Sequence, residues 1–359
     1  MTSLPTREGA ASWPDQPDCG LLASLVDSHA HPTDYKRFLT QKEDYRDHTA
    51  SLSLNKVCAM SSHLHDQTLV KQLYQEHPNK IIPAFGLHPW WSHHISFESG
   101  DENPSERKDH AIKLNHYASL FSSMRKDVMS DEDQLLLESF PAPTLMSTFI
   151  KDTLRPLLLE HPTAMLGEVG LDRSFRIPYP QTDAKSDRSD HKQAKKFTNL
   201  KVPMEHQLQL LNTQLDLAFE LNRNVSFHDV QAHGAVMDLL ASLAKNSERW
   251  KKSTSKICLH SFGGSVDVIQ RVSKHIDKKR IYFSFSTTIN ARLERLEELI
   301  RAVPDDRLLI ESDYNDIRMN EIRIWEILGI VCEAKGWTPE HAVKVLQDNW
   351  NTFSNLGSA

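Results

Sequence analysis

The sequence predicts an α/β fold in which eight parallel strands form a barrel. Short apolar runs recur along the chain, and each is short enough for a strand that is buried on both faces. A polar or helix-periodic segment follows each run, and such alternation leads to parallel pairing through right-handed crossovers. The eight runs are Leu22–Val26, Val57–Met60, Ile81–Phe85, Ala164–Leu166, Val225–Phe227, Ile257–Leu259, Ile281–Phe285 and Leu308–Ile310.

Helices are predicted between and after these runs. Met204–Leu221 and Glu321–Ala334 carry their aliphatic residues at roughly helical spacing. Thr338 followed by Pro339 is typical of an N-cap and the first helical position, so a last helix is expected through Leu346.

Two segments interrupt the alternation and are predicted to be insertions. The first, about 98–145, has 10 acidic and 5 basic side chains, and the second, about 173–201, has 8 basic and 3 acidic ones. Residues 1–20 contain three prolines and no apolar stretch, so they are expected to form a flexible tail. We therefore expect one barrel domain over 21–359, whose length without the insertions approaches the roughly 250 residues of a plain barrel.

Composition limits the classes of protein that this chain can represent. Of its 359 residues, 39% are hydrophobic, which predicts a core that carries polar insertions and excludes a wholly disordered chain. No run reaches the roughly 18 apolar residues of a membrane helix, so no membrane association is expected. The four cysteines lie far apart, which favours reduced thiols and a cytoplasmic or nuclear location. A net charge of −6 argues against a globally basic nucleic-acid surface, so any phosphate contact must be local.

Residues that suit metal ions follow six of the apolar runs. His29 and His31 alternate along a predicted strand end, so their side chains point the same way and can grip one ion. The other candidates, which would complete two adjacent sites, are Glu168, His228, His260 and Asp313. In a parallel barrel, residues at the carboxyl ends of the strands converge on one mouth. One such residue alone is more often structural, but six candidates spread over five separate runs favour a metal site.

The two carboxylates have different predicted roles. A carboxylate with two oxygens can bridge a pair of cations roughly 3.5–4 Å apart while offsetting their repulsion, and Glu168 is the candidate bridge. Asp313 is expected to ligate the first ion and to orient or deprotonate the attacking water.

The same segments resemble the signature blocks of the TatD-related DNases. The matching blocks are Asp27–His31, Gly86–Pro89, Gly167–Asp172, His260–Gly264 and Leu309–Asp313, within a similarity from about Asp27 to Phe353 that excludes the insertions. The resemblance implies a TIM (β/α)8 barrel of the metallo-dependent hydrolase type, two divalent ions (Mg²⁺, Mn²⁺ or Zn²⁺) and hydrolysis of DNA phosphodiesters, often as a 3′-5′ exonuclease. It also implies that His29, His31 and Asp313 hold one ion, that His228 and His260 hold the other, and that Glu168 is shared.

The chain departs from the family pattern on the substrate side. Val230 stands where the family usually has an arginine, Gly263 where it has serine or threonine, and Tyr314–Asp316 where a proline usually follows the aspartate motif. These changes affect the substrate side and leave all six predicted metal ligands in place.

Candidate substrate contacts lie near the predicted site. Lys192, Lys195 and Lys196 in the basic insertion are candidate phosphate contacts, although a solvated loop is the simpler interpretation. His88 either contacts a substrate phosphate as part of the catalytic set or fixes the turn before Pro89. Trp90 and Trp91 either stack on unpaired bases or, as we favour, pack under the first insertion.

We therefore predict a metal-dependent phosphodiester hydrolase that acts on single-stranded DNA or DNA ends with a water activated by two metal ions. One alternative is a metallohydrolase of a small ester or amide, which requires a closed apolar pocket. The other is an interaction protein of reduced activity whose insertions bind a partner, because fungal members of the resembled family include partners of a cell-cycle ubiquitin-ligase subunit.

Overall fold

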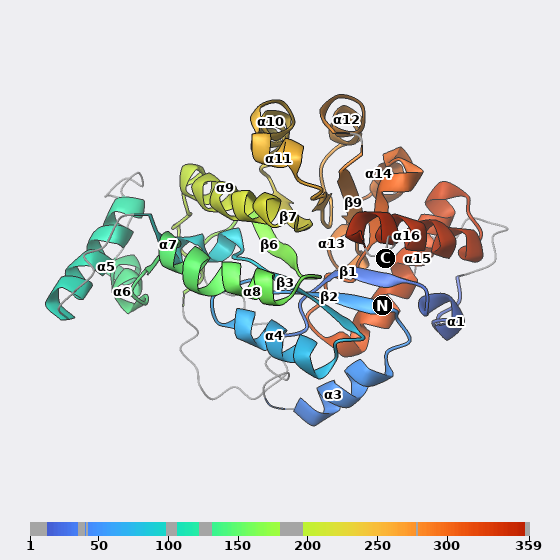
Figure 1. The fold of residues 1–359 in the computed structure, drawn as a ribbon, viewed down its shortest axis with the longest axis horizontal. Helices are drawn as coiled ribbons and strands as arrows, with labels where there is room; N and C mark the ends of the chain where they lie inside the picture. The colour runs from blue at the N-terminus through green and yellow to red at the C-terminus, as the bar shows by residue number, and fades with distance from the viewer. Residues whose placement is uncertain are drawn as a thin grey trace. The chain divides into compact units, whose positions relative to one another are not determined.

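The computed structural model describes residues 13–34, 40, 42–97, 106–121, 131–179, 197–277 and 279–355 (Figure 1). The chain divides into two compact units, one made of residues 1–60, 69–82 and 259–359 and the other of residues 61–68 and 83–258. An eight-stranded sheet has the order β1-β2-β3-β6-β7-β8-β9-β10. Its strands are β1 (Val26–Ala30), β2 (Lys56–Met60), β3 (Ile81–Phe85), β6 (Met165–Asp172), β7 (Val225–Val230), β8 (Ile257–Leu259), β9 (Ile281–Phe285) and β10 (Leu308–Ile310).

The first unit contains β1, β2, β9 and β10. β1 pairs with β2 and β10 pairs with β9, in both cases in parallel. The long helices α15 and α16 pack against each other (Figure 1, orange to red), and Gly336 ends α15 in the left-handed conformation. The helices are α1 (Cys19–Leu22), α3 (Lys42–Ser51), α4 (Asp66–Glu76), α12 (Val266–Arg271), η4 (Val272–Ile276), α13 (Thr287–Asn290), α14 (Leu296–Ala302), η5 (Asp305–Arg307), η6 (Ile317–Met319), α15 (Asn320–Lys335) and α16 (Pro339–Ser354).

The second unit contains β6 and β7, which pair in parallel, with β3 beside β6. Helix α9 lies along β6, because its leucines and Phe219 form one buried face (Figure 1). The helices are η1 (Pro89–His94), α5 (Glu106–Leu120), α6 (Asp131–Ser139), α7 (Met146–Thr148), η3 (Phe149–Leu154), α8 (Arg155–Glu160), α9 (Met204–Glu220), α10 (His233–Asn246) and α11 (Glu248–Lys252).

The two predicted insertions share a hydrophobic core. Short strands β4 (Ile95–Ser96) and β5 (Thr144–Leu145) pair at the base of the first insertion, which also contains α5 and α6. The Tyr179 hydroxyl of the second insertion donates to Asp133 of the first at 2.6 Å. The buried members of the shared core are Tyr117, Phe121, Leu136, Leu137, Ile177 and Leu200. The described stems of the second insertion are therefore packed, while the predicted phosphate contacts Lys192, Lys195 and Lys196 lie outside the described residues.

The strand prediction is confirmed for every run except the first. The ends of β3, β8, β9 and β10 agree with the predicted runs, but Leu22–Val26 is not a strand. Asp18 accepts hydrogen bonds from the N–H groups of Gly20 and Leu21 and starts the short helix α1, so β1 begins only at Val26. The prediction could not separate a buried helical turn from a strand, since both are short apolar runs.

The amino-terminal segment is described from Trp13 onward, and it packs on helix α15. The Trp13 ring packs on Trp325 of α15 with their centroids 4.7 Å apart, and the Trp325 indole donates to the Pro14 carbonyl at 2.6 Å. The tail predicted over 1–20 is thus fixed over its last residues by these contacts, and residues 1–12 lie outside the description.

Among the helices of the described residues, none combines the length and the hydropathy that a membrane-spanning segment requires.

Candidate metal centre

The first unit brings together His29, His31, His260 and Asp313, which we name the histidine–aspartate cluster. Nε2 of His29 lies 3.0 Å from Nε2 of His31, and Asp313 Oδ1 lies 3.9 and 3.7 Å from these two nitrogens. The rings of His29 and His260 stack with centroids 3.8 Å apart, and His260 Nδ1 lies 3.8 Å from Asp313 Oδ2. Ligand atoms of His29, His260 and Asp313 therefore all lie within 4.8 Å of one another.

The backbone between β1 and the segment after β10 aligns these side chains. Asp313 N–H donates to the His29 carbonyl and His31 N–H donates to the Tyr314 carbonyl, both at 2.9 Å. Side chains at alternate positions of an extended chain point the same way, so His29 and His31 share one face. Asp313 itself has a φ of 46°, which turns the chain away from the strand direction.

The Asp27 carboxylate stabilises the alignment of β1 with the segment after β10. Its oxygens accept from Ser312 N–H and from the Asn320 side-chain amide, each at 2.9 Å. Burial raises the pKa of Asp27 to about 7, although the hydrogen bonds from Ser312 and His29 act in the opposite direction.

Ser261 and Glu311 fix the orientation of the cluster's carboxylate and imidazole. The Ser261 hydroxyl lies 2.9 Å from Asp313 Oδ2 and 2.7 Å from Glu311 Oε1, and Glu311 Oε1 also faces His260 Nδ1 at 3.5 Å. Burial alone raises the pKa of Glu311, but the nearby His260, His29 and Ser284 outweigh it, so the pKa lies below its usual value. The fully buried Glu311 carboxylate is thus ionised, and it faces His260.

The second unit brings together His88, Glu168 and His228, which we name the glutamate–histidine cluster. Glu168 Oε1 lies 2.6 Å from His228 Nδ1 and 3.1 Å from His88 Nε2. His88 Nδ1 accepts from the Trp90 N–H at 3.1 Å, so in the neutral ring the proton is on Nε2 and points at Glu168. All three side chains are buried, and their ligand atoms lie within 4.8 Å of one another.

Asp172, the last residue of β6, lies on the other side of His228. Its Oδ2 accepts from the Trp90 indole at 2.6 Å and lies 3.4 Å from His228 Nε2, while its Oδ1 accepts from Ser174 and Phe175 N–H groups at 2.7 and 2.9 Å. Burial alone raises the pKa of Asp172, but the hydrogen bonds from His228 and Trp90 outweigh it and hold the pKa well below its usual range. His228 thus has a carboxylate at each nitrogen.

The donor sets of both clusters fit divalent cations. The paired Nε2 atoms of His29 and His31, and the carboxylates at both nitrogens of His228, bring imidazole and carboxylate groups as close together as the ligands of one cation must be. Imidazole with carboxylate suits Zn²⁺ and Mn²⁺, and carboxylate suits Mg²⁺. Glu311 faces a ring nitrogen of His260, and Asp172 faces a ring nitrogen of His228. Carboxylates in such positions orient histidines that bind metal ions.

Within each unit the structure brings predicted residues together. His260 lies with His29 and Asp313, whereas the prediction paired His260 with His228 on the second ion; that pairing stays a prediction. The bridging role of Glu168 would join the two clusters and also stays a prediction. His88 caps η1 and contacts Glu168, so it serves both the turn and the cluster.

Several predicted site residues lie within strands and not after them. Glu168 is the fourth residue of β6 and His228 the fourth of β7, because backbone pairing continues past the end of each predicted apolar run. Sequence reasoning gave no role to Asp172, Glu311 or Ser261, although each stands inside a quoted motif. Their signal was a polar residue within four positions of a predicted ligand in the same motif.

The departures from the family pattern have different structural settings. A Cβ added at Gly263 would meet no atom within 4 Å, so the structure has room for the usual serine or threonine there. Val230 is the half-buried last residue of β7, two positions after His228.

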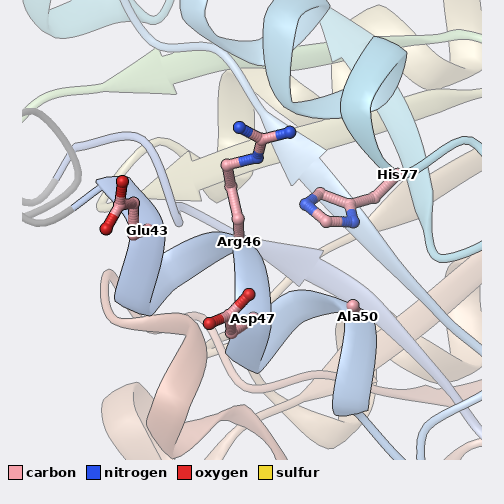
Figure 2. A pocket seen from close by; sticks show the side chains of 5 residues that line it. All are labelled: Glu43, Arg46, Asp47, Ala50 and His77. Carbon is pink, nitrogen blue, oxygen red and sulfur yellow. The ribbon is translucent and has the colours of Figure 1, made fainter.

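A shallow pocket in the first unit is unrelated to either cluster. It has a volume of about 310 Å³, and Figure 2 shows that Glu43, Arg46 and Asp47 of α3 line it opposite His77. Burial lowers the pKa of His77, and this pocket mixes acidic and basic side chains. It is not the closed apolar pocket that a small-ester hydrolase requires.

Comparison with known proteins identifies relatives of the whole chain. A family model described as "TatD related DNase" matches residues 26–355. The Cut9-interacting protein scn1 of Schizosaccharomyces pombe is 32% identical over 92% of this chain and 99% of its own length. A protein of Saccharomyces cerevisiae named an uncharacterized deoxyribonuclease is 29% identical over 72% of this chain and 74% of its own length.

A solved structure shows the same fold. YJJV, a TatD homologue from Escherichia coli, has a TM-score of 0.53 at 17% identity and covers 93% of this chain and 99% of its own. The sheet order and this likeness confirm the predicted TIM (β/α)8 barrel. Because the family match extends over nearly the whole chain and includes the strands that carry both clusters, the chain belongs to the TatD-related DNase family of metal-dependent hydrolases.

Proposed function

We propose that this chain hydrolyses phosphodiester bonds of DNA, either in single strands or at ends, as a 3′-5′ exonuclease that uses two divalent ions. The observation that carries the proposal is that each compact unit holds a largely buried cluster of imidazole and carboxylate donors within 4.8 Å of one another. The family match and the deoxyribonuclease name of the yeast relative support DNA as the substrate.

The residues of the two clusters have different proposed roles in binding the ions and in proton transfer. Bound divalent ions neutralise phosphate oxygens and lower the pKa of water. His29, His31 and Asp313 would hold the first ion, with His260 beside them, and His228 would hold the second together with Glu168. Ser261 engages Oδ2 of Asp313, so Oδ1, which faces His29 and His31, would accept the proton of the attacking water. His88 donates to Glu168 and holds its carboxylate in place.

The test is cleavage of end-labelled single-stranded DNA with Mg²⁺ or Mn²⁺. Asp313→Asn and Glu168→Ala should each lower the rate by at least about 100-fold, since each removes a charged ligand. Glu297→Gln, an exposed carboxylate of α14, is the matched control and should leave the rate unchanged. Label at the 5′ end should give a ladder and label at the 3′ end a mononucleotide; full activity of either cluster variant would refute the proposal.

Small esters and amides belong in the same assay. A wild-type enzyme that cleaves a small ester or amide but no DNA would establish the alternative of a small-substrate metallohydrolase. The DNA proposal predicts the opposite preference.

A protein partner is a second candidate function. The relative from S. pombe is named for its interaction with Cut9, and the shared core of the two insertions makes them one folded structure. We infer that a partner binds through the insertions, with the protein located in the cytoplasm or nucleus. Pull-down from cell extract should depend on the insertions and be unaffected by Asp313→Asn; capture that is lost only with the metal ligands would contradict this function. Imaging of a tagged chain tests the location.

A further inference from the structure

We propose that Trp90 forms a stacking platform for an unpaired nucleobase next to His228. The inference rests on the proposed function, because it names the part of the DNA substrate that this site would recognise. It gives a role to an aromatic side chain for which we favoured a packing role under the first insertion.

Trp90 is exposed but held in one orientation. Trp90 is 42% exposed, although tryptophan is usually largely buried. The indole N–H donates to the buried Asp172 at 2.6 Å, and the indole stacks on Phe175 with centroids 4.9 Å apart and planes 13° apart. Trp91, by contrast, packs against the rings of His63 and His94. A ring fixed at its edge and on one face loses little entropy when a ligand stacks on it.

The fixed indole lies beside the glutamate–histidine cluster. Its ring centroid is 4.8 Å from that of His88 and 6.3 Å from that of His228. One oxygen of Asp172 serves both Trp90 and His228, so the aromatic surface and the candidate ligand have a common anchor. A nucleotide whose phosphate lies at His228 therefore has a base within reach of Trp90.

Nucleobases are the chemical class that this surface fits. Each base has a flat π-face, and stacking on an aromatic side chain is tolerant of sequence. The arginine usual in the family is absent at Val230, so a stacked base supplies binding that does not depend on a cation there. Loss of the stacking ring should weaken binding by about 10-fold per base.

The experiment measures binding and not turnover. In the Asp313→Asn background, fluorescence anisotropy would compare a labelled thymidine hexanucleotide with an abasic strand of the same length. Trp90→Ala should weaken binding of the thymidine strand about 10-fold and leave the abasic strand unaffected. Trp90→Phe keeps a ring and should retain most of the preference for bases, which separates stacking from a folding defect.

Leu159→Ala is the matched control, since Leu159 of α8 is an apolar side chain of the same unit, is 54% exposed and does not belong to the glutamate–histidine cluster. It should keep the thymidine-to-abasic ratio of the parent. An unchanged ratio in Trp90→Ala would overturn the inference. If the wild-type protein does not cleave DNA but the binding ratio still depends on Trp90, the proposed hydrolysis fails and the base platform stands.

Discussion

At the scale of single residues, the candidate centre depends on buried groups that contact the predicted metal ligands without binding a metal ion themselves. Glu311 has no exposed surface, and its oxygens accept from the Ser261 N–H at 2.6 Å and from the Ser284 hydroxyl at 2.5 Å while facing His260. Such partners fix the ring orientation and raise the basicity of a ligating imidazole. The function of His260 is therefore tied to a residue that would not itself bind metal.

Glu311→Gln tests this dependence. The amide keeps the shape but loses the charge, so Mn²⁺ affinity should fall by about 10- to 100-fold, as measured by calorimetric titration. Ser284→Ala removes one hydrogen bond to the same carboxylate and should cost less affinity than Glu311→Gln. Equal Mn²⁺ affinity in Glu311→Gln and the parent would show that this carboxylate only fills space.

The ligands could be predicted from the sequence because each follows or lies within an apolar run that reads as a strand. The residues that support them could not, because Glu311 and Ser261 meet only when segments 50 residues apart are paired. A hydroxyl or a carboxylate beside a ligand has no periodicity of its own. Its partner is set by tertiary structure.

At the scale of elements, the close pairing of β6 and β7 places Glu168 beside His228. Gly170 allows this approach, because a Cβ there would lie 2.0 Å from the His228 carbonyl oxygen and the residue has a φ of 156°. Only glycine accommodates both the contact and this backbone conformation without displacing β7.

Gly170→Ala should therefore destabilise the protein by at least about 2 kcal/mol and reduce DNA cleavage. Gly234→Ala is the control, since a Cβ there meets nothing within 4 Å and alanine favours helix α10. Urea unfolding of both variants gives the comparison. A Gly170→Ala protein as stable as Gly234→Ala would disprove the close approach.

Helix η1 contains a second group of histidines, whose burial couples stability to pH. Burial lowers the pKa of His94 to about 4, with further lowering by His63, His116 and His65. The neighbouring His93 is also lowered well below its usual pKa, first by burial. The folded state therefore favours the neutral rings, whereas the unfolded chain takes up protons near pH 6.5.

The free energy of unfolding should fall as the pH falls from about 6.5 toward 4, because the unfolded chain then binds more protons. His94 alone should contribute a loss of about 2 kcal/mol between pH 7.5 and pH 5. Urea titrations at the two pH values, on the parent and on His94→Gln, measure the contribution as a difference. A variant whose stability falls with acid as much as that of the parent would exclude His94 as the source.

Elements show where sequence patterns suffice and where they fail. Met204–Leu221 and the Thr338 cap predicted α9 and the start of α16, because amphipathic spacing and capping are local properties. Helices α5 and α6 were missed inside a segment whose acidic composition suggested only an insertion. Their apolar residues face Ile177 and Leu200 of the other insertion, a pairing that no local pattern contains.

At the scale of the whole molecule, each compact unit supplies one cluster from distant parts of the chain. The first draws on His29 and Asp313, and the second on His88 and His228. Binding of an ion to the folded chain alone stabilises it by mass action, about 2.7 kcal/mol for each site at 100 times the dissociation constant. Metal binding should therefore be readable in the stability of the full chain.

Removal of metal with a chelator should lower the free energy of unfolding, and Mn²⁺ should restore it. If each cluster holds its own ion, His260→Ala and His228→Ala should each remove about half of the Mn²⁺-dependent stabilisation, and the double variant all of it. If one carboxylate bridges both ions, either single variant should remove more than half, because loss of one ion then weakens the other. Thermal or urea unfolding with and without Mn²⁺ decides between these results, with Glu297→Gln as the unaffected control. Stability that does not respond to Mn²⁺ in the parent would contradict metal binding by both clusters.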